Sequence, residues 1–107
     1  MVRIGSVVLN VSNLDRAADF WTKALGYVPD GDPAFLAPAS GVGGRLHLDE
    51  TDRTRLDLWL ADGEDQQTEV ERLVSLGATR VDWEYPEGAD FVVLADTEGN
   101  LFCVIGD

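Results

Sequence analysis

Basic side chains are scarce in this chain. Its 107 residues include 8 Lys and Arg against 20 Asp and Glu, which gives a formal net charge of −12. Contact with nucleic-acid phosphates needs clustered Lys or Arg, so the composition argues against a nucleic-acid partner. The acidic excess is typical of a solubilising surface, and it could also attract a cationic ligand. Charge alone does not separate these two interpretations.

Long apolar runs and cysteine pairs are also missing. No run approaches the roughly 18–20 apolar residues of a membrane helix. The first residues, MVRIGSVVLNV, lack the layout of a signal peptide. The single cysteine, Cys103, cannot form an intrachain disulfide, which agrees with a reducing compartment. Together these absences predict a cytoplasmic protein with no membrane partner.

The chain does contain an internal repeat. Residues 6–28 give an apolar strand, an Asp-rich turn and a helix, and residues 55–81 give the same order again. A repeated strand–helix–strands unit usually builds a cleft between its two halves. A length of 107 residues suits one hydrophobic core. We therefore predict one domain over 1–107, with a first module over about 1–52 and a second over about 53–107.

The first module reads as a strand, a helix and further strands. Alternating apolar residues predict a strand over 3–11, and helical spacing follows until Gly26. The aromatic residues Phe20 and Trp21 on this helix are predicted to pack in the core. The run 29–33 is a loop by composition, whereas 34–39 and 45–50 are predicted to be strands. The irregular stretch 28–41 could also hold a strand missing from this module, and the acidic run 30–33 could rim the cleft.

The secondary structure of the second module is easier to assign from the sequence. A strand over 55–61 should place Arg55, Asp57 and Trp59 on one face. A helix over about 65–76 follows, and later strands are predicted at 78–85, 91–96 and 101–106. Helices mixed with mostly antiparallel strands predict the α+β class, with both helices on outer faces.

Two segments resemble a known group of proteins. They are NLDRAADFWTKALGY, from the first helix, and GADFVVLADTEGNLFCVI, at the end of the chain. Both are similar to the short glyoxalase-like domains of the glyoxalase/bleomycin-resistance/dioxygenase (vicinal oxygen chelate) superfamily. The resemblance covers nearly the whole chain, although Thr97 stands where the family turn commonly has proline. It implies two β-α-β-β-β modules that form an incomplete barrel around a cleft, with helices outside and homodimers common.

The resemblance also implies four metal-ligand positions, which in the enzymes usually carry His, Glu, His or Gln, and Glu. The matching positions here are Ser6, His47, Arg55 and Cys103. Serine is a weak neutral ligand, and arginine is a permanent cation that cannot bind a metal. We therefore predict no metal cofactor. The alternative is a divalent metal held by His47 and Cys103.

That alternative would need a third ligand, for which Asp49 and Asp57 are candidates. The stretch 82–90 is acidic and could rim the cleft, with Trp83 and Tyr85 able to stack on a flat ligand. Val8 and Arg45 are expected on the cleft face beside the ligand-binding residues. The residues predicted to bind the ligand are Ser6, Asn10, Phe35, His47, Arg55, Asp57, Trp59 and Cys103.

Three functions are compatible with this pattern. The first is a small-molecule binding protein of the bleomycin-resistance type, without a working metal centre, which sequesters or carries its ligand. A cationic ligand would suit the acidic charge. The second is a metal-dependent lyase, isomerase or dioxygenase of the same superfamily, which would use His47, Cys103 and a nearby carboxylate; no residue is assigned as catalytic. The third is an interaction module whose cleft is filled by its own side chains.

Overall fold

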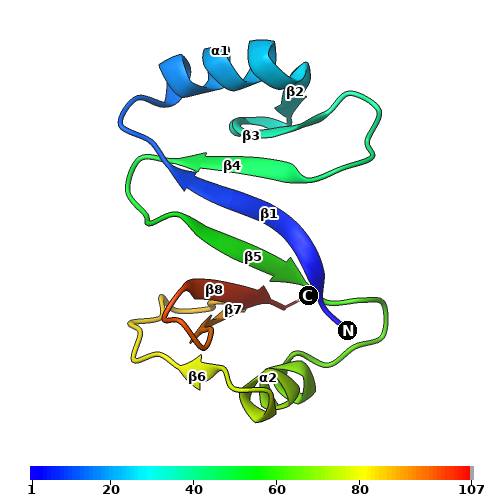
Figure 1. Ribbon diagram of the computed structural model, residues 1–107, viewed down its shortest axis with the longest axis vertical. Helices are drawn as coiled ribbons and strands as arrows, with labels where there is room; N and C mark the ends of the chain where they lie inside the picture. The colour runs from blue at the N-terminus through cyan, green and yellow to red at the C-terminus, as the bar shows by residue number, and fades with distance from the viewer. Residues whose placement is uncertain (107) are drawn as a thin grey trace. The chain divides into compact units, whose positions relative to one another are not determined.

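The computed structural model describes residues 1–106, which form two compact units. The first unit is Gly5–Thr54, and the second combines Met1–Ile4 with the chain from Arg55 onward. Each unit has one helix and a mixed sheet, as Figure 1 shows. The predicted α+β class is therefore confirmed. The prediction that the chain is a single domain stays a prediction.

In the first unit the strand order is β2-β3-β4-β1. Strands β1 and β4 are parallel, whereas β3 is antiparallel to both β2 and β4. The elements are β1 (Arg3–Asn10), α1 (Leu14–Leu25), β2 (Tyr27–Asp30), β3 (Asp32–Pro38) and β4 (Arg45–Asp49).

Helix α1 begins and ends where the sequence predicts. The Asn13 side chain accepts a hydrogen bond from the Arg16 N–H at 2.9 Å, and the Glu50 carboxylate accepts one from the Leu14 N–H at 2.9 Å. These bonds satisfy amide groups that a helix N-terminus leaves without partners. At the other end Gly26 takes φ 70°, a left-handed conformation that favours glycine.

The missing strand of the first module lies in the stretch that looked irregular. Strands β2 and β3 form a hairpin around Gly31, whose φ is 79°. Pro29 is tolerated because β2 is the last strand in the sheet order and its outer side needs no backbone donor. The loop predicted over 29–33 was wrong, because these residues belong to β2, β3 and the turn between them, whereas the strand predicted over 34–39 is confirmed as part of β3. The β-α-β-β-β order implied by the resemblance is present.

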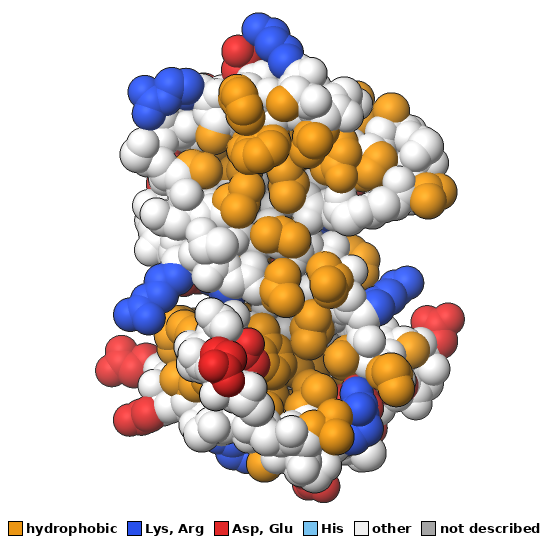
Figure 2. All heavy atoms as spheres, in the orientation of Figure 1, with side chains coloured by type: hydrophobic (Ala, Val, Ile, Leu, Met, Phe, Trp, Pro, Cys, Tyr) orange, Lys and Arg blue, Asp and Glu red, His pale blue; other side chains and the backbone are white. Residues whose placement is uncertain are grey.

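Phe20 is not a core residue, contrary to the prediction. Its side chain is 60% exposed, and it meets Trp21 edge to face with ring centroids 5.0 Å apart. Successive helical residues are separated by about 100°, so neighbouring rings cannot both face the sheet. Leu25 and Val28 are exposed as well. Figure 2 shows hydrophobic side chains gathered over α1 and the strands beside it.

In the second unit the strand order is β5-β8-β7-β6. Strands β5 and β8 are parallel, and β7 is antiparallel to β8 and β6. The elements are β5 (Arg55–Trp59), α2 (Gln66–Ser75), β6 (Thr79–Arg80), β7 (Phe91–Ala95) and β8 (Leu101–Ile105).

Helix α2 covers one face of this sheet. Val70 on the helix packs with Leu94 on β7 and Val104 on β8, and all three side chains are fully buried. The opposite face therefore carries the alternate residues of β5, β7 and β8. No helix among residues 1–106 is long and apolar enough to cross a membrane.

The strand predicted over 78–85 is much shorter than expected. Only Thr79 and Arg80 pair with β7, and residues 81–90 are irregular. Beyond Arg80, no strand within the described residues is paired with this edge of β7. The Val93 N–H on that edge donates instead to the Tyr85 hydroxyl, at 2.8 Å. Pro86, which has no N–H to donate, also disfavours a continued strand.

Candidate functional site

The eight predicted ligand-binding residues fall equally into the two units. Ser6, Asn10, Phe35 and His47 belong to the first, and Arg55, Asp57, Trp59 and Cys103 belong to the second. Their arrangement is therefore given within each unit.

In the first unit, strand register places the predicted residues on one sheet face. Ser6 is paired with Arg45, and Asn10 is paired with Asp49, across the parallel strands β1 and β4. His47 lies between them on β4 and is paired with Phe35 on β3. Alternate residues of a strand share a face, so all of these side chains emerge on the same side.

Four side chains on this face form a continuous row, in the order Arg45, Phe35, His47 and Asp49. The Arg45 guanidinium carbon lies 4.7 Å from the centroid of the Phe35 ring. The Phe35 and His47 rings are stacked, with centroids 4.1 Å apart and planes 14° from parallel. At the far end, His47 Nε2 lies 3.9 Å from Asp49 Oδ2. The row therefore presents a cation at one end and a carboxylate at the other.

Ser6 is held by the cationic end of the row. Its side chain is buried, and its Oγ accepts a hydrogen bond from Arg45 Nε at 3.1 Å. Arg45 Nη1 also lies 3.3 Å from Asp30 Oδ2 on β2. Asp30 belongs to an acidic run that was interpreted as a loop at the rim of the cleft, so its contact with Arg45 was not predicted.

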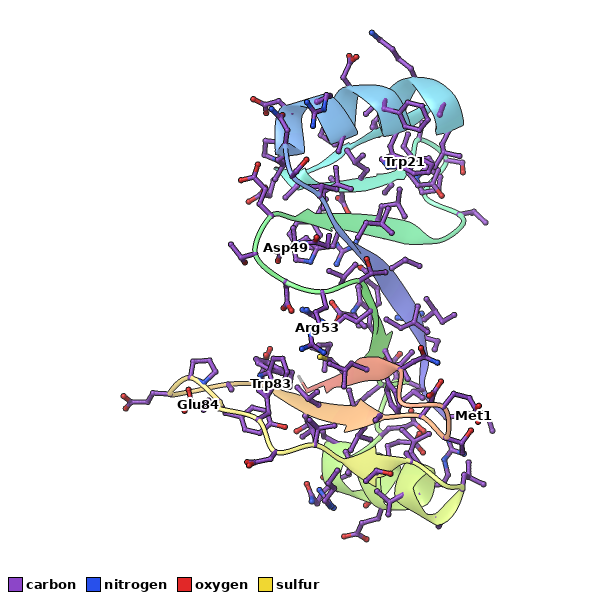
Figure 3. All side chains as sticks on the ribbon, turned by 60° about the vertical axis from the view of Figure 1, so that its left-hand side comes forward. Met1, Trp21, Asp49, Arg53, Trp83 and Glu84 are labelled. Atoms are coloured by element: carbon purple, nitrogen blue, oxygen red, sulfur yellow. The ribbon has the colours of Figure 1, made fainter. Side chains whose placement is uncertain are left out.

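Asp49 is fixed as an anion at the other end. The Thr51 backbone N–H donates to Asp49 Oδ1 at 2.8 Å, and the Thr51 hydroxyl and the Asp52 N–H also donate to it. These hydrogen bonds, the Thr51 N–H first among them, hold the pKa of Asp49 below its ordinary value. Asn10 Nδ2 donates to the Asp49 carbonyl oxygen at 3.3 Å. Figure 3 labels Asp49 at the end of β4.

In the second unit, the predicted residues lie on β5 and β8. Arg55 Nε lies 3.4 Å from Asp57 Oδ1, so these neighbours on one strand face form an ion pair. Asp57 is paired in register with Cys103, whose side chain is buried. Trp59 lies under the guanidinium of Arg3, 5.5 Å from its ring centroid. Alternation places all of these predicted residues on the face opposite α2.

Neither unit by itself supplies the donors of a divalent metal site. Within each unit, over residues 1–106, no three His, Cys, Asp or Glu side chains lie close enough together to hold an ion. In the first unit, the hydroxyl at the first family position already accepts from a guanidinium. In the second, the guanidinium of Arg55 is a donor only and is bound to a carboxylate.

Comparison with known proteins assigns the chain to a family. Residues 6–105 match the model of the glyoxalase-like domain. Since this match spans nearly the whole chain, the protein belongs to the glyoxalase-like domain family, and the resemblance noted in the sequence is confirmed. A search of the curated proteins finds no match.

Solved structures agree on the fold. A hypothetical protein, BH1468, from Bacillus halodurans C-125 is 10% identical, with a TM-score of 0.64 over 99% of this chain and 94% of that one. Methylmalonyl-CoA epimerase from Mycobacterium tuberculosis is 19% identical, with a TM-score of 0.58 over 96% of this chain and 86% of that one. At these identities the likeness concerns the fold alone.

Proposed function

We propose that this chain binds a small organic molecule on the strand face of the first unit described above and does so without a metal centre. In this proposal it sequesters or carries its ligand. The observation that carries the proposal is the hydrogen bond from Arg45 Nε to Ser6 Oγ. A guanidinium lies beside the residue that matches the family's first metal-ligand position.

Two electrostatic arguments support the absence of a metal. A fixed positive charge beside Ser6 would repel a divalent ion, and this repulsion is strong where water is excluded. Arg55, at another family position, is also a permanent cation and offers no lone pair. His47 and Cys103 remain as donors, and a buried thiol binds a metal only after it has lost its proton.

The chemistry of this face supports a small-molecule ligand. Ligand sites commonly combine apolar and aromatic walls with a few polar groups that fix orientation. Phe35 and His47 supply stacked rings. Asp49 adds a carboxylate, which together with the net charge of −12 favours a cationic ligand. Within the second unit, Asp57 and Trp59 stay predicted ligand-binding residues. A cytoplasmic location and a homodimer stay predictions.

A thermal-shift screen tests this proposal. A metabolite panel rich in amines, with neutral analogues of each, is added to the purified protein in the presence of a chelator. We expect at least one amine to raise the melting temperature, because a ligand that binds only the folded state stabilises it. The shift should be lost in Phe35→Leu and weakened in Asp49→Asn, and it should persist in Asp62→Asn, a charge-matched control on an exposed residue.

Two other results would redirect the assignment. No shift across the panel would favour the interaction module, in which the chain's own side chains fill the cleft. A shift that appears only when a divalent metal is supplied, and that disappears in His47→Ala, would favour the metal-dependent lyase, isomerase or dioxygenase. Either result contradicts the proposal.

A further inference from the structure

A pocket lies in the second unit, next to the strand that carries Cys103. It has a volume of about 440 Å³ and is built only from residues 80–93 of the second unit. Its floor is the outer edge of β7, and its wall is the irregular connection that follows β6. The volume is within the range of small-molecule sites. Figure 3 labels Trp83 and Glu84 on this connection.

The lining of this pocket is mostly apolar. Phe91 and Val93 come from β7, and Val81 and Pro86 come from the connection. Tyr85 and Phe91 lie with ring centroids 5.5 Å apart and planes inclined by 54°. This wall suits an aromatic or branched aliphatic group, since such surfaces bind by removing apolar area from water.

The pocket has two polar side chains, and both can donate hydrogen bonds. The Tyr85 hydroxyl oxygen accepts from the Val93 N–H at 2.8 Å, which fixes its position and leaves the phenolic proton directed elsewhere. Arg80 contributes a guanidinium, which only donates. Among residues 1–106 no carboxylate lies within ion-pair distance of Arg80. A ligand that satisfies these groups must bring acceptors.

From this geometry we propose that the pocket on the β7 edge binds a small organic carboxylate with an aromatic or branched apolar body. The apolar body lies against Phe91 and Val93, and the carboxylate accepts from Arg80 and from the Tyr85 hydroxyl. Val93 is paired with Cys103, so the pocket adjoins the predicted residues of the second unit. It does not rest on the ligand site proposed for the first unit.

Nearby acidic side chains repel a bound anion and therefore limit how tightly a carboxylate can bind. Asp82, Glu84, Glu87 and Asp90 lie on the same connection and are exposed. None of them lines the pocket, and salt screens their repulsion at the surface. The carboxylate contact is therefore worth a modest factor, and matched probes are needed to detect it.

Three probes that share one apolar body isolate the charge. They are 4-phenylbutyrate, 4-phenylbutanol and 4-phenylbutylamine, each titrated to about 10 mM, the weak end of small-ligand affinity. Binding is followed by chemical-shift changes of backbone amides in the isotope-labelled full chain. We expect the carboxylate to bind most tightly and to shift amides at residues 80–93.

The variants assign the contact to one side chain. Arg80→Gln should weaken carboxylate binding by about threefold to tenfold and leave alcohol binding unchanged. Arg53→Gln removes the same charge from an exposed position in the other unit and should change neither affinity. Tyr85→Phe, which removes the phenolic proton, should weaken carboxylate binding as well.

Several results would overturn the proposal. They are no shifts at residues 80–93 with any probe, an amine that binds as tightly as the carboxylate, or an equal loss in Arg80→Gln for carboxylate and alcohol. The wild-type comparison of the three probes stands even if a variant fails to fold. Shifts confined to residues of the first unit would support the first site and contradict this one.

Discussion

The imidazole of His47 stacks on the ring of Phe35, with centroids 4.1 Å apart and planes 14° from parallel. Phe35 is also the ring beneath the Arg45 guanidinium, so this one side chain contacts both His47 and Arg45. The pair follows from register, because Phe35 on β3 lies directly opposite His47 on β4. Phe35 is therefore the residue that organises this face of the first unit.

Replacing Phe35 by leucine should test that role. Phe35→Leu keeps an apolar side chain but removes the ring stack and the cation–π contact, which together are worth about 1–2 kcal/mol. Urea unfolding should show a loss of that size in the free energy of unfolding. Phe20→Leu, at a ring that is 60% exposed, should lose less than about 0.5 kcal/mol. Equal losses in the two variants would contradict the organising role of Phe35.

The hydrogen bonds to Asp49 predict a pH-dependent contribution to stability. Its pKa in the folded chain is lowered, chiefly by the Thr51 N–H, so the ionised form stabilises the folded state above the unfolded pKa of about 4. That stabilisation is lost as the pH falls through the lowered folded-state pKa. Asp49→Asn should therefore cost roughly 1 kcal/mol at neutral pH and progressively less in acid.

Unfolding by urea at neutral pH and near pH 2 measures this difference. Asp62→Asn makes the same charge change at an exposed carboxylate and should have little effect at either pH. A cost of Asp49→Asn that persists undiminished in acid would mean that the ionised carboxylate is not what stabilises this turn.

Gly77, after helix α2, should tolerate no side chain. Its φ is 122°, and a Cβ built there would lie 2.9 Å from the Thr97 methyl carbon. Gly77→Ala should therefore lower the free energy of unfolding by about 1–3 kcal/mol. Gly26→Asn makes a useful comparison, because Gly26 has φ 70° and nothing within 4 Å of its Cβ position. A Gly77→Ala loss no larger than that of Gly26→Asn would contradict the steric argument.

The helices were the most predictable part of the fold. Asn13 and Gly26 carry local signals, since a side-chain cap and a left-handed residue act within one turn of the helix. The strands were less predictable, because pairing depends on distant residues. Pro29 and Gly31 are typical of a loop, and only the pairing of β2 with β3 makes this segment a hairpin. The strand after α2 ends at Arg80, although apolar and polar residues continue to alternate beyond it.

In the candidate site, too, features set by local sequence were predicted and contacts between distant residues were not. Alternation along β4 predicted that His47 and Arg45 share a face, and strand register then brought Phe35 against His47. The hydrogen bond from Arg45 to Ser6 joins residues 39 positions apart in the chain, and no local pattern indicates it. The contact of Asp30 with Arg45 was missed for the same reason, since it depends on the β2–β3 hairpin.

The metal content of the purified chain tests the central claim most directly. The protein is equilibrated with zinc, nickel, manganese and iron(II) under reducing conditions, dialysed, and analysed for bound metal beside His47→Ala. We predict no stoichiometric metal in either protein and equal traces in both, because a guanidinium occupies the neighbourhood of Ser6 and Arg55 donates no lone pair. Binding of on the order of one ion per chain, lost in His47→Ala, would contradict the account.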